Sequence, residues 1–346
     1  MFSTFKWGIP VALIAMAGLS AAPVGAVEAD YFKGKTVTIN IGYGFGGSYG
    51  MYARTFAKNL GKHIPGNPTI VVKSMPGAGG MKMTAFAYNV MPRNGYNLLV
   101  PPDTVVINQL MRPKKMRFDA RKFTWLGSSN QTNSIMVVRT DTGVKSVADM
   151  KRIKIMGGTS GKSSNGYISP KLAIALLGLK GDVITGYKGS AKSIFAIEQG
   201  EVQMASFNWQ TWRSKVPQWF KGDKPFARAI LQVGATKDPD LPDVPMLTDL
   251  VSGEDKALIS FVATAGALGR GIATPPKTPK HVIMTLRKAS DAMNADASFA
   301  ADLKKRRLRL IPTKGAALQK IVNDAIRDAK PSVVKRAANL VYGRGS

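Results

Sequence analysis

Strand-like and helix-like segments alternate along most of this chain of 346 residues, and no other feature constrains its fold as strongly. Apolar runs of strand length predict strands at 36–42, 69–75, 97–102, 134–140, 153–158, 182–187, 202–207 and 227–234. The segments between them have helical periodicity, most clearly where Tyr52, Phe56 and Leu60 share one face. This order predicts an α/β fold whose sheets are mainly parallel and covered by helices on both faces.

Small residues gather where the predicted strands pass into helices. These junctions are rich in Gly, Ser, Thr or Pro and lie at 44–50, 76–80, 101–104, 157–166 and 187–193. In an open α/β sheet such junctions lie at the carboxyl ends of the strands, where ligands bind. Glycine lets a ligand approach the backbone, and the N-terminus of the next helix offers free N–H groups and a partial positive charge. The loops therefore predict an anion site, although short turns of this kind also favour Gly and Ser when they bind nothing.

Two of these loops resemble nucleotide-binding motifs without completing them. The stretch from Gly42 to Gly47 matches G-x-G-x-x-G between a predicted strand and a predicted helix. A dinucleotide site also needs an acidic residue about 20 positions further on, where this chain has Lys73 and no carboxylate. The stretch MGGTSGKSS misses the P-loop pattern by one position, because Met156 stands where glycine is required. We interpret both as general anion-binding loops and expect no cofactor.

The composition leaves few groups for catalysis or metal binding. The chain has no Cys and only two His, His63 and His281. The lack of Cys excludes thiol nucleophiles, thiolate metal sites and disulfides. A Ser-His-Asp triad would need one of the two histidines, and neither lies in a nucleophile-elbow loop. We therefore expect no metal site and a protein that is not an enzyme.

The charge balance is strongly basic, with 49 Lys and Arg against 21 Asp and Glu and a formal net charge of +28. Such a field attracts anions without specifying which. The basic stretch KKRRLR lies in an ordinary amphipathic helical region, so nucleic acid is not an expected partner. Solvated helix faces are the favoured interpretation of the charge. A secreted polyanion-binding protein is the alternative.

The first 26 residues have the layout of a secretory signal. Lys6 precedes an apolar run from 9 to 22, and small residues follow at Val24 and Ala26, the positions that a signal peptidase reads. The run is shorter than the roughly 20 residues that span a bilayer. We predict a cleaved signal peptide at 1–26 and a periplasmic mature protein.

Longer stretches of the chain resemble one family. The most specific are HIPGNPTIVVKSMPGAGG, at 63–80, and DPDLPDVP, at 238–245. Together with their flanking sequence they resemble the substrate-binding proteins of tripartite tricarboxylate transporters, the Bug-type receptors. The resemblance implies a two-lobed, type II-like periplasmic-binding-protein fold that closes around a small solute and delivers it to a membrane permease. It also implies lobe 1 at 27–130 plus 257–346 and lobe 2 at 131–256, and we expect a monomer.

The resemblance indicates which loops would hold the ligand. The candidate ligand-binding residues are Tyr43, Phe45, Gly46, Gly47, Ser48, Ala78, Gly79 and Thr104 on lobe 1, and Thr159, Ser160, Ser163, Asn165 and Tyr187 on lobe 2. Many relatives carry an acid just after the glycine-rich turn, whereas this chain has Gly50 there.

The charges in the candidate loops favour an organic acid over an amino acid. The loops contain no Glu and a single Asp, Asp103, but they hold Lys162, Lys188 and Lys192. A receptor for an amino acid needs a partner for the ligand's ammonium group, because an unpaired buried cation is strongly unfavourable. We therefore predict a small mono- or dicarboxylate without an amino group, whose body contacts Tyr43 or Phe45. Asp103 is the one group in these loops that could pair with an ammonium.

Overall fold

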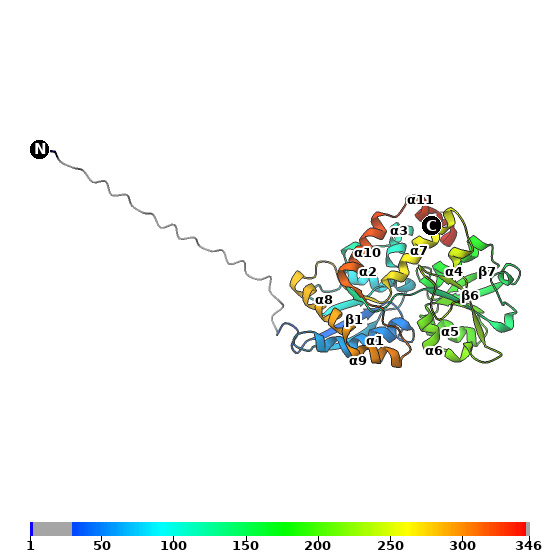
Figure 1. The fold of residues 1–346 in the computed structure, drawn as a ribbon, viewed down its shortest axis with the longest axis horizontal. Coiled ribbons are helices and arrows are strands. Elements are labelled where there is room, and N and C mark those ends of the chain that lie inside the picture. Colours follow the sequence, from blue (N-terminus) through cyan, green and yellow to red (C-terminus); the bar gives the residue numbers. More distant parts are fainter. Residues whose placement is uncertain (3–29, 344–346) are drawn as a thin grey trace.

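The computed structural model describes residues 1–2 and 30–343, which form two lobes lying side by side (Figure 1). The predicted signal peptide at 1–26 falls outside the described residues, apart from its first two positions. Within the described part of the chain, no helix is long and apolar enough to cross a membrane. Each lobe is built around one β-sheet.

The sheet of lobe 1 has six strands in the order β11-β4-β10-β3-β1-β2. They are β1 (Thr36–Ile41), β2 (Thr69–Ser74), β3 (Asn97–Val100), β4 (Thr124–Ser128), β10 (Gly271–Thr274) and β11 (Thr313–Lys314). β1 pairs parallel with β2 and β3. β10 is inserted between β3 and β4 and pairs antiparallel with both, so the sheet joins segments that are far apart in the sequence.

The sheet of lobe 2 has five strands in the order β7-β6-β8-β5-β9. They are β5 (Ser134–Arg139), β6 (Ile155–Thr159), β7 (Gly181–Thr185), β8 (Met204–Phe207) and β9 (Ala227–Val233). β6 pairs parallel with β7 and β8. β5 is inserted antiparallel between β8 and β9.

The α/β fold is confirmed, and every strand predicted from the sequence is present. Most strands of each sheet run parallel as expected, but β5, β10 and β11 run antiparallel to the others, so both sheets are mixed. A helix that returns along the same sheet makes the next strand parallel. β5 and β10 instead follow the points where the chain passes from one sheet to the other, and they enter their sheets from the opposite end.

Helices cover both sheets. They are α1 (Ser48–Leu60), α2 (Met81–Asn89), α3 (Val105–Met111), α4 (Asn165–Leu177), α5 (Ser190–Glu198), α6 (Trp209–Lys215), α7 (Glu254–Leu268), α8 (Lys280–Ala295), α9 (Ala297–Lys305), α10 (Gly315–Arg327) and α11 (Pro331–Tyr342). In α1 the predicted face is confirmed, because Tyr52, Phe56 and Leu60 are all buried. They pack in a cluster with Ile39 and Ile41 of β1.

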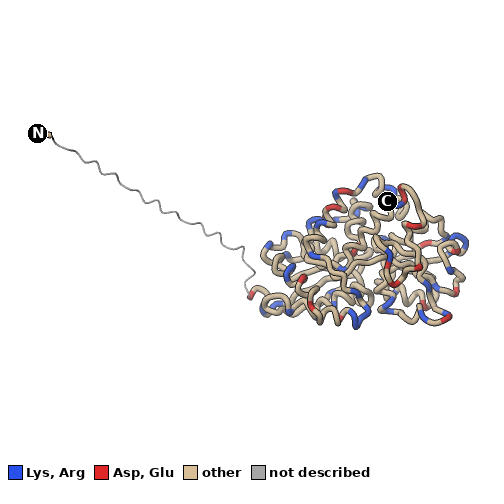
Figure 2. Tube along the Cα trace, in the orientation of Figure 1, with Lys and Arg blue, Asp and Glu red and all other residues tan. Residues whose placement is uncertain are grey.

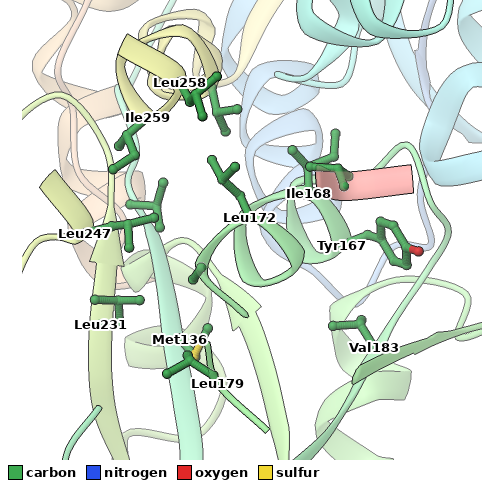
Figure 3. Packing of buried hydrophobic residues seen from close by; sticks show 14 of the residues in the cluster. Met136, Tyr167, Ile168, Leu172, Leu179, Val183, Leu231, Leu247, Leu258 and Ile259 are labelled. Atoms are coloured by element: carbon green, nitrogen blue, oxygen red, sulfur yellow. The ribbon is translucent and has the colours of Figure 1, made fainter. Parts of the chain in front are cut away.

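The last helix contacts both lobes. Ala337 and Val341 of α11 belong to the same apolar cluster as Leu172 of α4 and Ile107 of α3. Figure 3 shows Leu172 in this cluster, near Leu258 and Ile259 of α7. The strands of lobe 1 lie within 36–128 and 271–314, and those of lobe 2 within 134–233. The boundaries at 131 and 257 stay a prediction, and α11 is an element that the lobes share.

Candidate functional site

A cavity lies between the lobes at the ends of strands from both sheets. It is lined from lobe 1 by Tyr43, Gly44, Gly47, Ser48, Tyr49, Asp103 and Arg270, and from lobe 2 by Thr159, Ser160, Ser164, Asn165, Gly166, Gly189, Ser190, Ser206, Phe207, Asn208 and Thr211. The space open to the centre of a water-sized sphere is about 60 Å³, so the cavity encloses only a small molecule. The lobes approach closely beside it, because a methyl group on Gly79 would lie 2.6 Å from the nitrogen of Ser164.

Three helices, α1, α4 and α5, begin at this cavity without a side-chain cap at their N-termini. α1 begins at Ser48, α4 at Asn165 and α5 at Ser190, and all three residues line the cavity. No side chain caps these termini, and none of the three helices has an acidic residue in its first turn. Their first N–H groups have no partner within the helix, and each terminus carries a partial positive charge of about half a unit. The arrangement can therefore bind an anion through backbone donors from both lobes.

The short helix α6 also begins at the cavity, but its N-terminus is already satisfied. Asn208 Oδ1 accepts a hydrogen bond from Thr211 N at 2.9 Å, which is an ordinary side-chain cap. The side-chain nitrogen of Asn208, Nδ2, donates a hydrogen bond to Ser48 Oγ on the other lobe at 3.0 Å.

A buried ion pair stands in the wall that lobe 1 contributes. Arg270 Nη1 donates to Asp103 Oδ2 at 3.1 Å, and the two side chains are 3% and 6% exposed. The guanidinium carbon of Arg270 lies 3.8 Å from the centre of the Tyr49 ring. Burial raises the pKa of Asp103, and the neighbouring Arg270 acts in the opposite direction. The pair places two charges beside the cavity that neutralise each other.

Ser48 connects this ion pair to lobe 2. Its Oγ accepts one hydrogen bond from Arg270 Nη2 at 2.9 Å and another from Asn208 at 3.0 Å. A hydroxyl that accepts two hydrogen bonds still has its own O–H to donate. Because Ser48 lines the cavity, this donor can serve an anion there.

Aromatic rings give the cavity an apolar side. The rings of Tyr43 and Tyr49 pack with their centres 4.5 Å apart. The Tyr43 hydroxyl donates to the carbonyl oxygen of Gly79 at 2.8 Å, which fixes the ring against the neighbouring turn. Phe207, the last residue of β8, lines the cavity from lobe 2. The carbon skeleton of a small ligand can pack against these rings.

The structure brings many of the candidate residues together. Those that line the cavity are Tyr43, Gly47, Ser48, Thr159, Ser160 and Asn165. Gly79 and Tyr187 line an adjoining hollow, to which Tyr43, Ser160 and Lys188 also contribute. The candidate loops of the two lobes therefore face each other.

The other candidates lie outside the cavity lining. Phe45 is a surface side chain, 43% exposed, with the guanidinium of Arg54 5.9 Å from its ring centre, so it is no part of the apolar wall. Gly46 packs against Ala191 of the opposite lobe, and Ala78 belongs to the turn that precedes Gly79. Thr104 and Ser163 contact each other across the lobes.

Sequence reasoning missed Arg270, Tyr49, Phe207, Asn208 and Thr211 as lining residues. Arg270 comes directly before β10, and no glycine-rich loop marks it. Because β10 runs antiparallel, its first residue pairs with Ser128, the last residue of β4. A residue that precedes an antiparallel strand thus lies at the carboxyl edge of its parallel neighbours. Arg270 could not be predicted as a lining residue, because the sequence does not show that β10 runs antiparallel to its neighbours.

Gly50 does not offer an empty position for an acid. A Cβ atom at Gly50 would lie 2.1 Å from the carbonyl oxygen of Phe45, which is closer than real contacts allow. The glycine is required by the close approach of the preceding loop to α1.

Within the described residues, no three His, Cys, Asp or Glu side chains gather to hold a metal ion. His63 instead forms a hydrogen bond with Asp296 at 3.0 Å.

Two mixed α/β sheets with a cavity between them give this chain the two-lobed fold of a periplasmic binding protein. A family model described as the tripartite tricarboxylate transporter family receptor matches residues 52–338, so the chain belongs to that family of receptors.

Comparisons with individual proteins agree with this. The chain is 27% identical over 301 residues to the UPF0065 protein in the gbd 5' region of Cupriavidus necator, with 85% of each chain covered. It superposes on the periplasmic binding protein BugD with a TM-score of 0.70 at 18% identity, over 88% of this chain and 97% of BugD. MatC from Rhodopseudomonas palustris, solved with bound malate, gives a TM-score of 0.67 at 17% identity, over 88% and 99%. At such identities the structures establish the shared fold.

Proposed function

We propose that this receptor is periplasmic, binds a small carboxylate without an amino group between its lobes, and delivers it to the permease of a tripartite tricarboxylate-type transporter. It acts as a monomer and catalyses no reaction. One observation carries the proposal: three uncapped helix N-termini meet at a cavity whose lining acid, Asp103, is already paired with Arg270.

The electrostatics of the cavity favour an anion. Among the residues that line it, Arg270 and Asp103 carry the charges, and they cancel. The partial positive charges of the three helix N-termini then make the electrostatic potential in the cavity positive. Each stabilises a nearby anion by about 0.3–1 kcal/mol, and by up to about 2 kcal/mol where it is partly buried. N–H donors that are already in place do not have to reorganise when a carboxylate replaces water.

The same arrangement disfavours an ammonium group. Asp103 Oδ2 accepts from Arg270, and the main-chain N–H of Asp103 donates to the Tyr49 hydroxyl at 2.7 Å. An ammonium that approached Asp103 would also approach the guanidinium. Its attraction to Asp103 and its repulsion from Arg270 are then of similar size, each about 4 kcal/mol at about 4 Å and an effective dielectric constant of about 20, so little net attraction is left. Asp103 is therefore a partner for Arg270 and a poor partner for a ligand cation.

Structural relatives support a carboxylate ligand. MatC was solved with malate, and another Rhodopseudomonas palustris protein of the same fold, with a TM-score of 0.68 at 21% identity, was solved with adipate. In the present chain, Tyr43, Tyr49 and Phe207 suit the carbon skeleton of such an acid.

The alternative, a polyanion-binding protein, draws on the net charge of +28. Figure 2 shows Lys and Arg spread along both lobes with Asp and Glu among them. Some of the basic side chains pair with acids, as Lys58 does with Asp302 at 2.8 Å. This distribution agrees better with solvated surfaces than with one dedicated face.

Calorimetry with matched ligands tests the proposal. Succinate and aspartate have the same carbon chain and carboxylates and differ by the ammonium group. We expect the acid without the amino group to bind at least about tenfold more tightly, because the ammonium has no free partner. Tighter binding of aspartate would refute the proposed specificity. A salt series on the same samples separates the alternative, since polyanion binding falls steeply with salt.

A further inference from the structure

The last residue of α11 lies between the two lobes. The ring of Tyr342 is stacked on that of Tyr167 in α4, with ring centres 6.1 Å apart and planes at 11°. The guanidinium carbon of Arg112, which follows α3 in lobe 1, lies 4.8 Å from the centre of the Tyr342 ring. The Tyr342 hydroxyl is 3.2 Å from the carbonyl oxygen of Lys162 and 3.3 Å from Oδ1 of Asn108. One side chain thus contacts α3, α4 and the loop that precedes α4.

Lobe 1 holds that loop of lobe 2 at Ser163. The carbonyl oxygen of Ser163 accepts hydrogen bonds from Thr104 Oγ1 at 2.8 Å and from Asn108 Nδ2 at 2.7 Å. Arg112 Nη1 donates to Ser163 Oγ at 3.1 Å. Thr104, Asn108 and Ser163 are all buried. These bonds join side chains of lobe 1 to a loop of lobe 2, so a rotation that separates the lobes at this point must break them.

The opposite side of the same loop faces the cavity. Ser160, Ser164 and Asn165 line the cavity, and none of them bonds to Thr104, Asn108 or Arg112. The Ser164 hydroxyl lies 2.9 Å from that of Thr159 and donates to Gly161 O at 2.8 Å, so the loop is held firmly from within. A shift at Ser163 is therefore transmitted to Ser164 and to the free N-terminus of α4.

We propose that Thr104, Asn108, Arg112 and Tyr342 form an interlobe clasp that favours the closed arrangement and positions the 160–164 loop without touching the ligand. The proposal depends on the proposed function in one respect, because it takes the 160–164 loop to be part of the ligand site. By linkage, a ligand that stabilises the loop favours the clasped state, and loss of the clasp weakens ligand binding. The clasp also explains why Thr104 and Ser163 lie beside the site and do not line the cavity.

One atom of Arg112 offsets part of the clasp's stability. Its Nε atom is buried and has no hydrogen-bond partner among the described residues. A buried donor without a partner is unfavourable, and opening would expose it to water. The clasp is therefore a reversible contact that can take part in a ligand-driven motion.

Pulsed dipolar spectroscopy on spin-labelled protein tests the clasp without any ligand. The chain has no Cys, so labels at introduced cysteines are unique. Arg93→Cys in lobe 1 and Asp223→Cys in lobe 2 replace exposed side chains. Thr104→Val removes one donor at nearly constant volume, and Tyr342→Ala removes the stacked ring. The control is Tyr96→Phe, which removes a hydroxyl that donates to Tyr31 O at 2.8 Å within lobe 1.

We expect Thr104→Val to raise the ratio of open to closed protein about three- to tenfold, the factor that one hydrogen bond is worth. Tyr342→Ala should raise it further, and Tyr96→Phe should leave it at the wild-type value. Distance distributions in Thr104→Val and Tyr342→Ala that match the wild type would overturn the clasp. If succinate, at a concentration shown by calorimetry to saturate the protein, leaves the wild-type distribution unchanged, closure around the ligand is contradicted, while the comparison of the variants without ligand still tests the clasp.

Discussion

The role of Asp103 in the cavity depends on Arg270, a residue that lies far away in the sequence. Taken alone, it is the acid of the candidate loops and could pair with an amino group. In the folded protein it is paired with Arg270, which β10 brings to the same edge of the sheet. The loops could be identified from sequence, but the charge state of the cavity could not, because that depends on a residue-to-residue contact across 167 positions.

Asp103→Asn should change stability and binding in opposite directions. The substitution leaves Arg270 without its counter-charge in a buried site, which destabilises the fold by about 3 kcal/mol. It also removes a negative charge beside the carboxylate site, so succinate should bind roughly ten- to hundredfold more tightly. Urea unfolding and calorimetry measure the two effects. The exposed pair partner Asp182 provides the control, because Asp182→Asn should alter stability by less than about 1 kcal/mol and leave binding unchanged. Weaker succinate binding in Asp103→Asn would contradict the assignment.

Gly79 combines a left-handed backbone conformation with a close interlobe contact, and the effects of substitution on the two can be separated. Gly79 has a φ of +64° and Gly178 a φ of +63°, but nothing lies within 4 Å of a Cβ placed on Gly178. Alanine should therefore destabilise the protein by about 1–2 kcal/mol at either position. Only Gly79→Ala places a methyl group 2.6 Å from Ser164 N, so only this variant should lose ligand affinity, by tenfold or more. Equal affinities in the two variants, measured by calorimetry, would show that lobe contact at Gly79 plays no part in binding.

At the scale of elements, the helix N-termini give a test that uses charge alone. Asn165→Asp adds an acid to the first turn of α4, which should stabilise the helix by about 0.3–1 kcal/mol. Because Asn165 lines the cavity, the same acid should weaken succinate binding at least about tenfold. Ala316→Asp, in the first turn of α10 and away from the cavity, is the matched control and should stabilise without affecting binding. Thermal unfolding and calorimetry give both quantities, and undiminished binding by Asn165→Asp would argue against an anion at α4.

The strands that were predicted and the strands that were missed differ in a physical way. Those rich in Val, Ile or Leu with a glycine directly after them, such as β1 and β9, were found from sequence. The missed strands β4, β10 and β11 are short, and β4 and β10 contain glycine, which weakens any strand pattern. β10 pairs with both β3 and β4, and β11 pairs with β4, so these strands form by completing one another's hydrogen bonds. Such pairing depends on the assembled sheet, so a short stretch of sequence cannot predict it.

At the scale of the whole molecule, the family-like stretch DPDLPDVP joins the lobes away from the ligand cavity. Asp238, its first residue, accepts hydrogen bonds from both terminal nitrogens of Arg309 at 2.8 and 2.9 Å. The carbonyl oxygen of Arg309 accepts from the Tyr52 hydroxyl of α1 at 2.6 Å, which fixes the arginine on lobe 1. The motif was specific enough to suggest the family, but its contact to Arg309 could be seen only in the structure.

The claim that a carboxylate is held between two closing lobes is tested most directly by small-angle X-ray scattering with and without saturating succinate. The cavity takes its donors from both lobes, so binding should favour the compact arrangement and reduce the radius of gyration. Gly79→Leu, which prevents the close approach at Ser164, should give the same radius with and without succinate. A wild-type radius that does not change at a succinate concentration shown by calorimetry to saturate the protein would contradict the account.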